Sequence, residues 1–305
     1  MTPNPLYVPS PNPAVQVPLA ELKQHLLLFV ESPPGPKTAR AVYDLYQATW
    51  GDRFTTYSST AFGTISRDWS QAARQRFESQ ELPDLRKHEH WGYSFSDGRA
   101  SDSWLFMFHG YRPALEPGKA SFYRFEFDWQ LEPARLLEFT EAVLSIVRCV
   151  SGYAGYMFQG QPLGPFGKNS FDQIYAWARR YWAVDVEDLD VTVNHMLDGY
   201  KCPSWLTVIG ERLEGRNPAA VSEAASAAFR SLRTPGGVLL QAGLKQTRGD
   251  QNRKEPLDGY VAIARALEPL QVQQHGTFGG SRWDESRTMA WLRRFTAPGG
   301  WSATP

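Results

Sequence analysis

The chain has 305 residues, and its 32 lysine and arginine residues balance its 32 aspartate and glutamate residues. A net charge of zero argues against a general nucleic-acid-binding protein, which carries a basic excess, and against an acidic mimic of nucleic acid. The two cysteines exclude a disulfide scaffold and a four-cysteine metal cage.

The two ends of the chain differ in composition from the rest. Nine of the 22 prolines lie in the first 36 residues, and proline removes a backbone donor and favours extended conformations. We therefore expect residues 1–20 to form a proline-rich flexible arm and residues 297–305 to form a flexible tail. The first residues lack the basic and apolar stretches of a secretion signal, and the longest apolar run, at 26–30, is too short to span a membrane. We expect a cytoplasmic protein.

Between these ends, hydrophobic periodicity predicts a series of strands and helices. Residues 121–129, for example, alternate between an aromatic side and a polar side, which is typical of a strand. In chain order, the predicted elements are a strand at 25–31, helices at 37–50 and 67–82, strands at 91–96, 104–111 and 121–129, a helix at 134–150, a strand at 153–158, a helix at 170–181, a strand at 205–209, a helix at 218–232, a strand at 238–242, and helices at 257–267 and 285–295.

This order of elements predicts an α+β fold with a mixed, largely antiparallel sheet and packed helices, because consecutive strands in the middle are flanked by helices. We expect a single large domain over residues 21–296. The Gly- and Pro-rich stretch near 160–168 is the one candidate boundary between two α/β lobes.

Two short motifs suggest chemistry, and neither is complete. In the sequence His88-Glu89-His90, both histidines would lie on one side of a strand, as two metal ligands do, but no third histidine is near in sequence. Residues 164–169 resemble the end of a phosphate-binding loop, but Pro162 replaces a required glycine and Asn169 a required hydroxyl residue. We therefore predict no metal, no cofactor and no catalytic residues.

Four carboxylates are concentrated within six residues, at Asp185, Glu187, Asp188 and Asp190. The run lacks the central glycine and the distal glutamate of a calcium loop. It is either a solvated loop or a negative patch that faces a basic partner. Such a patch would speed association with that partner.

The chain also has 11 tryptophans. Most should lie in the core, but some could be exposed anchors, because Trp, Tyr and Arg dominate the energetics of protein–protein interfaces. Trp182 is a candidate anchor because Arg179 and Arg180 lie close to it in sequence. The alternative is an ordinary surface on which arginine stacks on indole.

A longer pattern occupies the last third of the chain. Its residues are Trp205, Gly249, Asp250, Asn252, Arg253 and Tyr260, followed by Ala-Arg-Ala-Leu-Glu-Pro at 264–269. This pattern resembles the TsiV-like family of type VI secretion system immunity proteins, formerly a domain of unknown function, and the resemblance covers about residues 25–270. Family members place proline where this chain has Leu244 and an aliphatic residue where it has Gln251.

The resemblance implies a bacterial protein that binds and neutralises a toxin delivered by type VI secretion, with a nuclease effector as the expected partner. It implies no catalysis, and we expect no nucleic acid, membrane or small-molecule substrate to bind directly. We interpret the residues of the shared pattern as structural. Toxin contacts should lie in variable segments, because each immunity protein must fit one toxin and reject its relatives.

Our hypothesis is that the protein occludes the toxin and that the acidic run pairs with a basic nuclease cleft. The candidate contact residues are Asp185, Glu187, Asp188, Asp190, Trp182, Arg179 and Arg180. Two alternatives stay open. One is an enzyme whose active site follows no motif, and the other is an adaptor or chaperone that loads the toxin onto the secretion apparatus.

Overall fold

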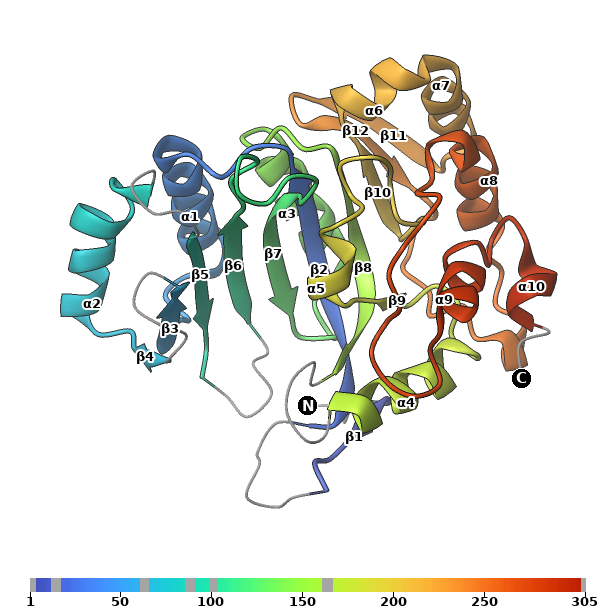
Figure 1. Ribbon diagram of the computed structural model, residues 1–305, viewed down its shortest axis with the longest axis horizontal. Helices are drawn as coiled ribbons and strands as arrows, with labels where there is room; N and C mark the ends of the chain where they lie inside the picture. The colour runs from blue at the N-terminus through green and yellow to red at the C-terminus, as the bar shows by residue number, and fades with distance from the viewer. Residues whose placement is uncertain are drawn as a thin grey trace.

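The structure, a computed structural model, describes residues 4–11, 18–60, 66–85, 91–98, 104–160 and 167–302. In this part of the chain the strands form one sheet of 12 strands, with a main path in the order β11-β12-β10-β8-β2-β7-β6-β5-β3-β4 (Figure 1). Two short strands lie off this path: β1 pairs with β2, and β9 pairs with β8. The β8–β9 pair is parallel and the other pairs are antiparallel. The predicted α+β fold with a mixed, largely antiparallel sheet is confirmed.

Most predicted elements are present, with ends that differ by a few residues. The strands are β1 (Tyr7–Val8), β2 (Ala20–Val30), β3 (Thr56–Ser59), β4 (Arg67–Asp68), β5 (Trp91–Ser96), β6 (Leu105–Gly110), β7 (Ser121–Phe127), β8 (Ser151–Gly160), β9 (Asp185–Val186), β10 (Leu206–Ile209), β11 (Arg230–Thr234) and β12 (Gly237–Gln241). The α-helices are α1 (Pro36–Trp50), α2 (Gln71–Arg76), α3 (Pro133–Leu144), α4 (Gly167–Ala178), α5 (Leu189–Thr192), α6 (Glu211–Arg216), α7 (Pro218–Ala227), α8 (Asp258–Ala266), α9 (Glu285–Leu292) and α10 (Pro298–Ser302). Among the described residues, no helix has the length and apolar character needed to cross a membrane.

The central strand β2 is buried along its whole length, between β7 and β8. Leu26 and Leu28 join a core on one face of the sheet, and Leu27 and Phe29 join a second core on the other face. This alternation follows from the period of two along a strand. The sequence predicted only the apolar second half of β2, because its first half consists mainly of polar residues that the fold buries.

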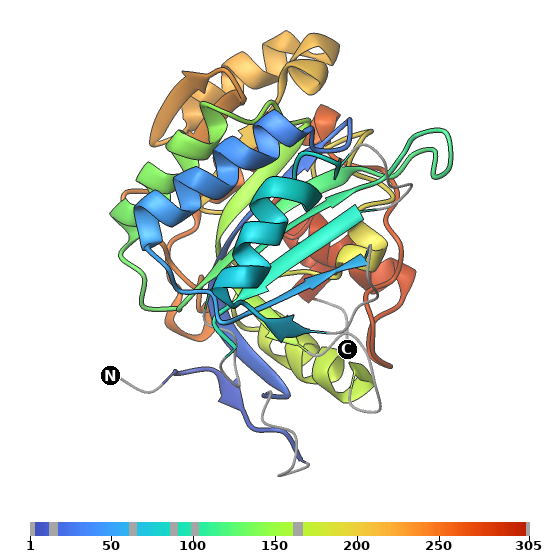
Figure 2. The same cartoon turned by 90° about the vertical axis from the view of Figure 1, so that its left-hand side faces the viewer.

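Helices cover both faces of the sheet. The first core contains residues of α1, α3, α6, α7 and α8, and Figure 2 shows α1 and α3 side by side along this face. The aromatic side of β7, predicted to be buried, lies in this core through Tyr123, Phe125 and Phe127. The second core contains residues of α4, α9 and α10.

Two of the predicted helices are wrong in part. At 67–82, Arg67 and Asp68 pair with β3 as strand β4, and α2 begins only after Ser70, whose side chain accepts a hydrogen bond from the backbone N–H of Ala73 at 3.2 Å. At 218–232, α7 ends at Ala227, and the chain returns as β11 in a hairpin with β12. Local spacing of apolar residues does not reveal a strand whose partner lies elsewhere in the chain.

Both ends of the chain contribute to the fold, in contrast to the expected flexible arm and tail. Tyr7 and Val8 pair with β2, and Leu6 is buried beside them. At the other end, Trp301 in α10 is completely buried. Leu6 and Trp301 belong to the second core, where burial of their apolar side chains is favourable.

Candidate functional site

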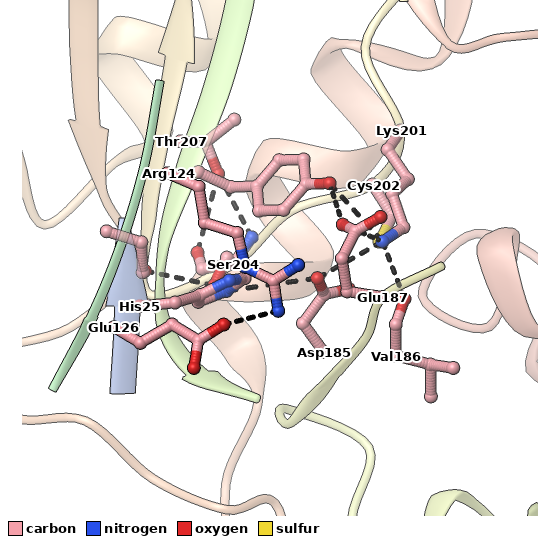
Figure 3. A network of polar contacts seen from close by, with 12 residues as sticks. His25, Arg124, Glu126, Asp185, Val186, Glu187, Lys201, Cys202, Ser204 and Thr207 are labelled. Carbon is pink, nitrogen blue, oxygen red and sulfur yellow. Dashed lines mark hydrogen bonds and ion pairs between the residues drawn. The ribbon is translucent and has the colours of Figure 1, made fainter. Parts of the chain in front are cut away.

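The acidic run lies partly inside the protein. Asp185 in β9 is 4% exposed and Glu187 is 9% exposed. Both carboxylates contact the ammonium group of Lys201, at 3.1 and 2.9 Å, and Lys201 is completely buried (Figure 3). The hypothesis that all four carboxylates form a surface patch is therefore wrong for Asp185 and Glu187. Their counterion comes from within the chain, which offsets the large cost of burying charge.

Lys201 has further polar contacts. Its Nζ donates a hydrogen bond to the backbone carbonyl of Val186 at 2.6 Å and lies 3.3 Å from the hydroxyl of Tyr153. The Tyr153 hydroxyl in turn donates to Glu187. Although burial acts to raise the pKa of Glu187, Lys201 and Tyr153 hold it below its ordinary value. Burial raises the pKa of Asp185.

His25 borders the same network from β2 (Figure 3). Its Nε2 lies 3.8 Å from a carboxylate oxygen of Asp185, and its ring centre lies 5.5 Å from that of Tyr153. Burial lowers the pKa of His25 to about 3, so the imidazole is neutral at physiological pH. His25, Asp185, Lys201 and Tyr153 are residue types that serve acid–base chemistry, but all four are buried, and a substrate in solution has no access to them.

The other two members of the acidic run lie nearer the surface. Asp188 is half-buried and accepts a hydrogen bond from the backbone N–H of Gly279 at 3.3 Å. Burial raises the pKa of Asp188 to about 6. Asp190, in α5, is exposed. Of the four carboxylates, these two are the ones that remain available to a partner.

A second group of buried charges, which the sequence did not indicate, lies on β2 and β7. The ammonium group of Lys23 lies 3.7 Å from a carboxylate oxygen of Glu21 and 3.4 Å from one of Glu126. The other carboxylate oxygen of Glu126 lies 2.5 Å from the guanidinium of Arg124. Lys23 and Glu126 are 103 residues apart in the chain, so no local pattern could have paired them.

Replacing Glu21 with glutamine should stabilise the protein at pH 8 and have little effect at pH 5. Burial raises the pKa of Glu21 to about 7 from an ordinary value of 4.5, so the folded protein retains a proton that the unfolded chain releases. Stability from this carboxyl is therefore fully present below pH 4.5 and is lost as the pH rises through 7. Because glutamine cannot ionise, we expect a gain on the order of 2 kcal/mol at pH 8.

Urea unfolding of the wild type and Glu21→Gln at the two pH values measures this difference. Glu223→Gln, at an exposed position of α7, is the matched control and should change stability little at either pH. An equal gain for Glu21→Gln at pH 5 and pH 8 would contradict the raised pKa.

The loop at residues 247–255, called the shared loop below, contains four residues of the shared pattern and contacts the segment before the acidic run. Asp250 is 1% exposed and accepts two hydrogen bonds from the guanidinium of Arg180, at 2.9 and 2.7 Å. The same carboxylate accepts the backbone N–H of Asn252 at 3.1 Å. Arg253 lies at 3.8 Å from it and is largely exposed. Paired, two-point contacts of this kind fix the geometry of both partners.

The backbone of the same loop is bonded to the segment around Trp182. The N–H of Trp182 donates to the carbonyl of Gly249 at 3.2 Å, and the N–H of Gln251 donates to the carbonyl of Arg180 at 2.9 Å. Gly249 has φ +66°, and a Cβ there would lie 2.8 Å from the backbone nitrogen of Ala183. Glycine is required at this position for both reasons.

Two aromatic residues of the pattern are part of the first core. Trp205 is buried before β10, and its indole N–H donates to the carbonyl of Gly243 at 2.8 Å. Tyr260 is buried in α8, with its ring 5.6 Å from that of Phe295. Both aromatic side chains therefore help to hold the first core together.

The three predicted anchors differ in what they contact. Arg180 is bonded to Asp250, as described. Arg179 donates hydrogen bonds to the carbonyls of Trp301 and Ser302 and so attaches α10 to the end of α4. Trp182 is half-buried, with its indole N–H donating to the carbonyl of Arg179 at 3.2 Å, and it borders a cavity of 350 Å³. Of these three residues, Trp182 is the one that lines this cavity, and its contact with a partner stays a prediction.

The two incomplete chemical motifs lie largely outside the described residues. This applies to His88, Glu89 and His90 and to residues 161–166. Within the described ranges, no group of three or more His, Cys, Asp or Glu residues could hold a metal ion.

Comparisons with known proteins place the chain in a known group. The model of the TsiV family, described as "Type VI immunity for VRR-NUC", matches residues 40–295. No curated protein matches the chain. Among solved structures, the Pseudomonas aeruginosa T6SS protein PA0821 is similar, with a TM-score of 0.75 and 19% sequence identity over 95% of this chain and 88% of that chain. At this identity the structural likeness shows a shared fold.

Proposed function

Because the chain belongs to the TsiV family of type VI immunity proteins for VRR-NUC nucleases, we propose that it protects the cell by binding the nuclease domain of its toxin and covering the active site. The observation that carries this proposal is the family match, which spans residues 40–295 and so includes the shared loop and most residues of both cores, although not the central strand β2. We propose stoichiometric binding, with no catalysis by the immunity protein itself.

The arrangement of charge supports a role in binding. The buried His, Asp, Lys and Tyr groups lie out of reach of a substrate, and the charged networks on β2, β7 and β9 join strands to one another. Such networks are suited to holding a fixed surface, which reduces the ordering cost of binding a partner. We place the encounter in the cytoplasm, where the nucleic acid that a nuclease would degrade is found.

Titration of the purified cognate VRR-NUC toxin with this protein should test the proposal. We expect nuclease activity to fall linearly with added immunity protein and to be abolished near a ratio of one to one, and we expect co-expression to restore growth. A stable complex that retains full nuclease activity would contradict occlusion and indicate an adaptor instead. Absence of both a complex and growth rescue would overturn immunity toward this toxin.

A further inference from the structure

We propose that the cavity beside Trp182 is the docking pocket for an apolar side chain of the toxin that is flanked by carboxylates. This inference rests on the proposed function and names the part of the surface that would perform it. The cavity has a volume of 350 Å³ and lies between the shared loop, α8 and the chain after α9. In Figure 1, α8, α9 and α10 lie on the same side of the molecule.

The walls of this docking pocket are mainly apolar, although Gln251 and the buried Arg294 also line it. Trp182, Leu257 and Val261 are half-buried and pack against the first core, and Phe295 lies buried at the same cavity. A volume of this size is near the lower end of the roughly 300–1,000 Å³ range typical of ligand pockets. It therefore suits one large side chain of a protein partner, because the side chains that dominate the binding energy of an interface commonly fill pockets of this kind.

The rim of the docking pocket is basic. Lys254 and Arg265 are exposed at its edge, and neither is ion-paired with any residue that the structure describes. The carboxylate that also lines the cavity, Glu255, is directed into the shared loop, where it accepts hydrogen bonds from the Thr247 hydroxyl at 2.6 Å and the Asp250 N–H at 3.1 Å. The outward charge of the rim is thus positive, and it complements carboxylates on the partner.

The pocket is also held in a fixed shape. The carbonyl of Trp182 accepts a hydrogen bond from the Nε of the buried Arg294 at 2.6 Å, and its N–H is bonded to Gly249. Lys254 has φ +53°, in the left-handed region that non-glycine residues seldom occupy. Such conformations persist where the surrounding structure enforces them, and they concentrate at functional sites. A preorganised pocket loses less entropy when a partner binds.

Two variants separate the apolar and the charged contributions. Trp182→Ala removes one wall, and we expect the dissociation constant for the toxin nuclease domain to rise at least tenfold, mainly through faster dissociation. The double variant Lys254→Glu and Arg265→Glu reverses the rim, and we expect association to slow at least tenfold at low salt, with a smaller difference at high salt. Surface plasmon resonance with the immobilised toxin domain measures both rates.

The matched control for the charge reversal is Arg40→Glu with Arg148→Glu, which changes the net charge equally at exposed positions away from this pocket. It should bind within twofold of the wild type. Circular dichroism of each free variant tests folding. Because Lys254 and Arg265 are exposed, their reversal keeps the proposal testable if Trp182→Ala is unstable.

The outcomes distinguish this inference from the proposed function. If the wild type inhibits the toxin and all variants bind it within twofold of the wild type, the docking pocket is wrong while occlusion stands. If the wild type itself neither binds nor inhibits, both proposals are overturned. If the rim reversal and its control slow association equally, the docking pocket is also contradicted, because the slowing would then come from the change in net charge alone.

Discussion

Replacing Lys201 with methionine should lower the free energy of unfolding by about 3–5 kcal/mol. Lys201 is completely buried and contacts the carboxylates of Asp185 and Glu187. Methionine fills a similar volume but leaves two buried carboxylates facing each other without a cation, and an uncompensated buried charge is among the most costly defects in a folded protein. Urea unfolding followed by tryptophan fluorescence and circular dichroism measures the loss.

A second variant shows whether charge or packing is responsible. Lys201→Met combined with Asp185→Asn and Glu187→Gln removes all three charges and should recover a large part of the lost stability. Arg40→Met, which breaks an exposed ion pair with Asp44, is the control and should cost less than about 0.5 kcal/mol. A cost for Lys201→Met similar to that of the control would contradict a stabilising role for the buried lysine.

Replacing Trp301 with alanine should lower the free energy of unfolding by a similar amount, about 3–5 kcal/mol. Truncating a large aromatic side chain in a core loses its transfer free energy and also leaves a cavity. Trp301 lies near the end of the chain and is completely buried. Its ring is stacked with that of Trp283, with ring centres 5.8 Å apart. It also packs edge-on against the ring of Tyr175, with ring centres 5.6 Å apart. The guanidinium of Arg179 lies 5.2 Å from the ring centre.

Phe229→Ala provides the control, because Phe229 is 58% exposed and its loss should change stability by no more than about 0.5 kcal/mol. Thermal unfolding of both variants, with urea unfolding at 25 °C, gives the comparison. Equal and small effects at the two positions would agree with a flexible tail and contradict the docking of α10.

The fold was largely predictable from the sequence where burial follows local periodicity. The alternation in β7 and the helical spacing in α1 and α8 each place apolar residues in the first core. The sequence failed where a partner from a distant segment determines the outcome. Local spacing predicts the end of a helix where pairing with β12 instead forms β11. Composition predicts a flexible tail where Trp301 instead packs against Tyr175 of α4.

The candidate site was less predictable for the same reason. A run of acidic residues has the same local sequence whether it faces solvent or a buried lysine, and Lys201 is part of a segment without periodicity. Trp182 was predicted as an anchor from its residue type and neighbours, and this stays a prediction. Its position beside the basic rim depends on α8, whose approach to Trp182 is determined by the tertiary fold.

The pairing of β2 with strands far along the chain has a consequence for when the folded protein is first available. β2 lies near the start of the chain, yet its neighbours β7 and β8 are made much later, and Lys23 finds Glu126 across 103 residues. Pairing over such distances requires large loops to close, and the entropy lost on closure precedes the favourable contacts, which slows folding. The pairs of β2 with β8 can be complete only after residue 160 has been synthesised, so a chain still being made does not yet present the folded surface.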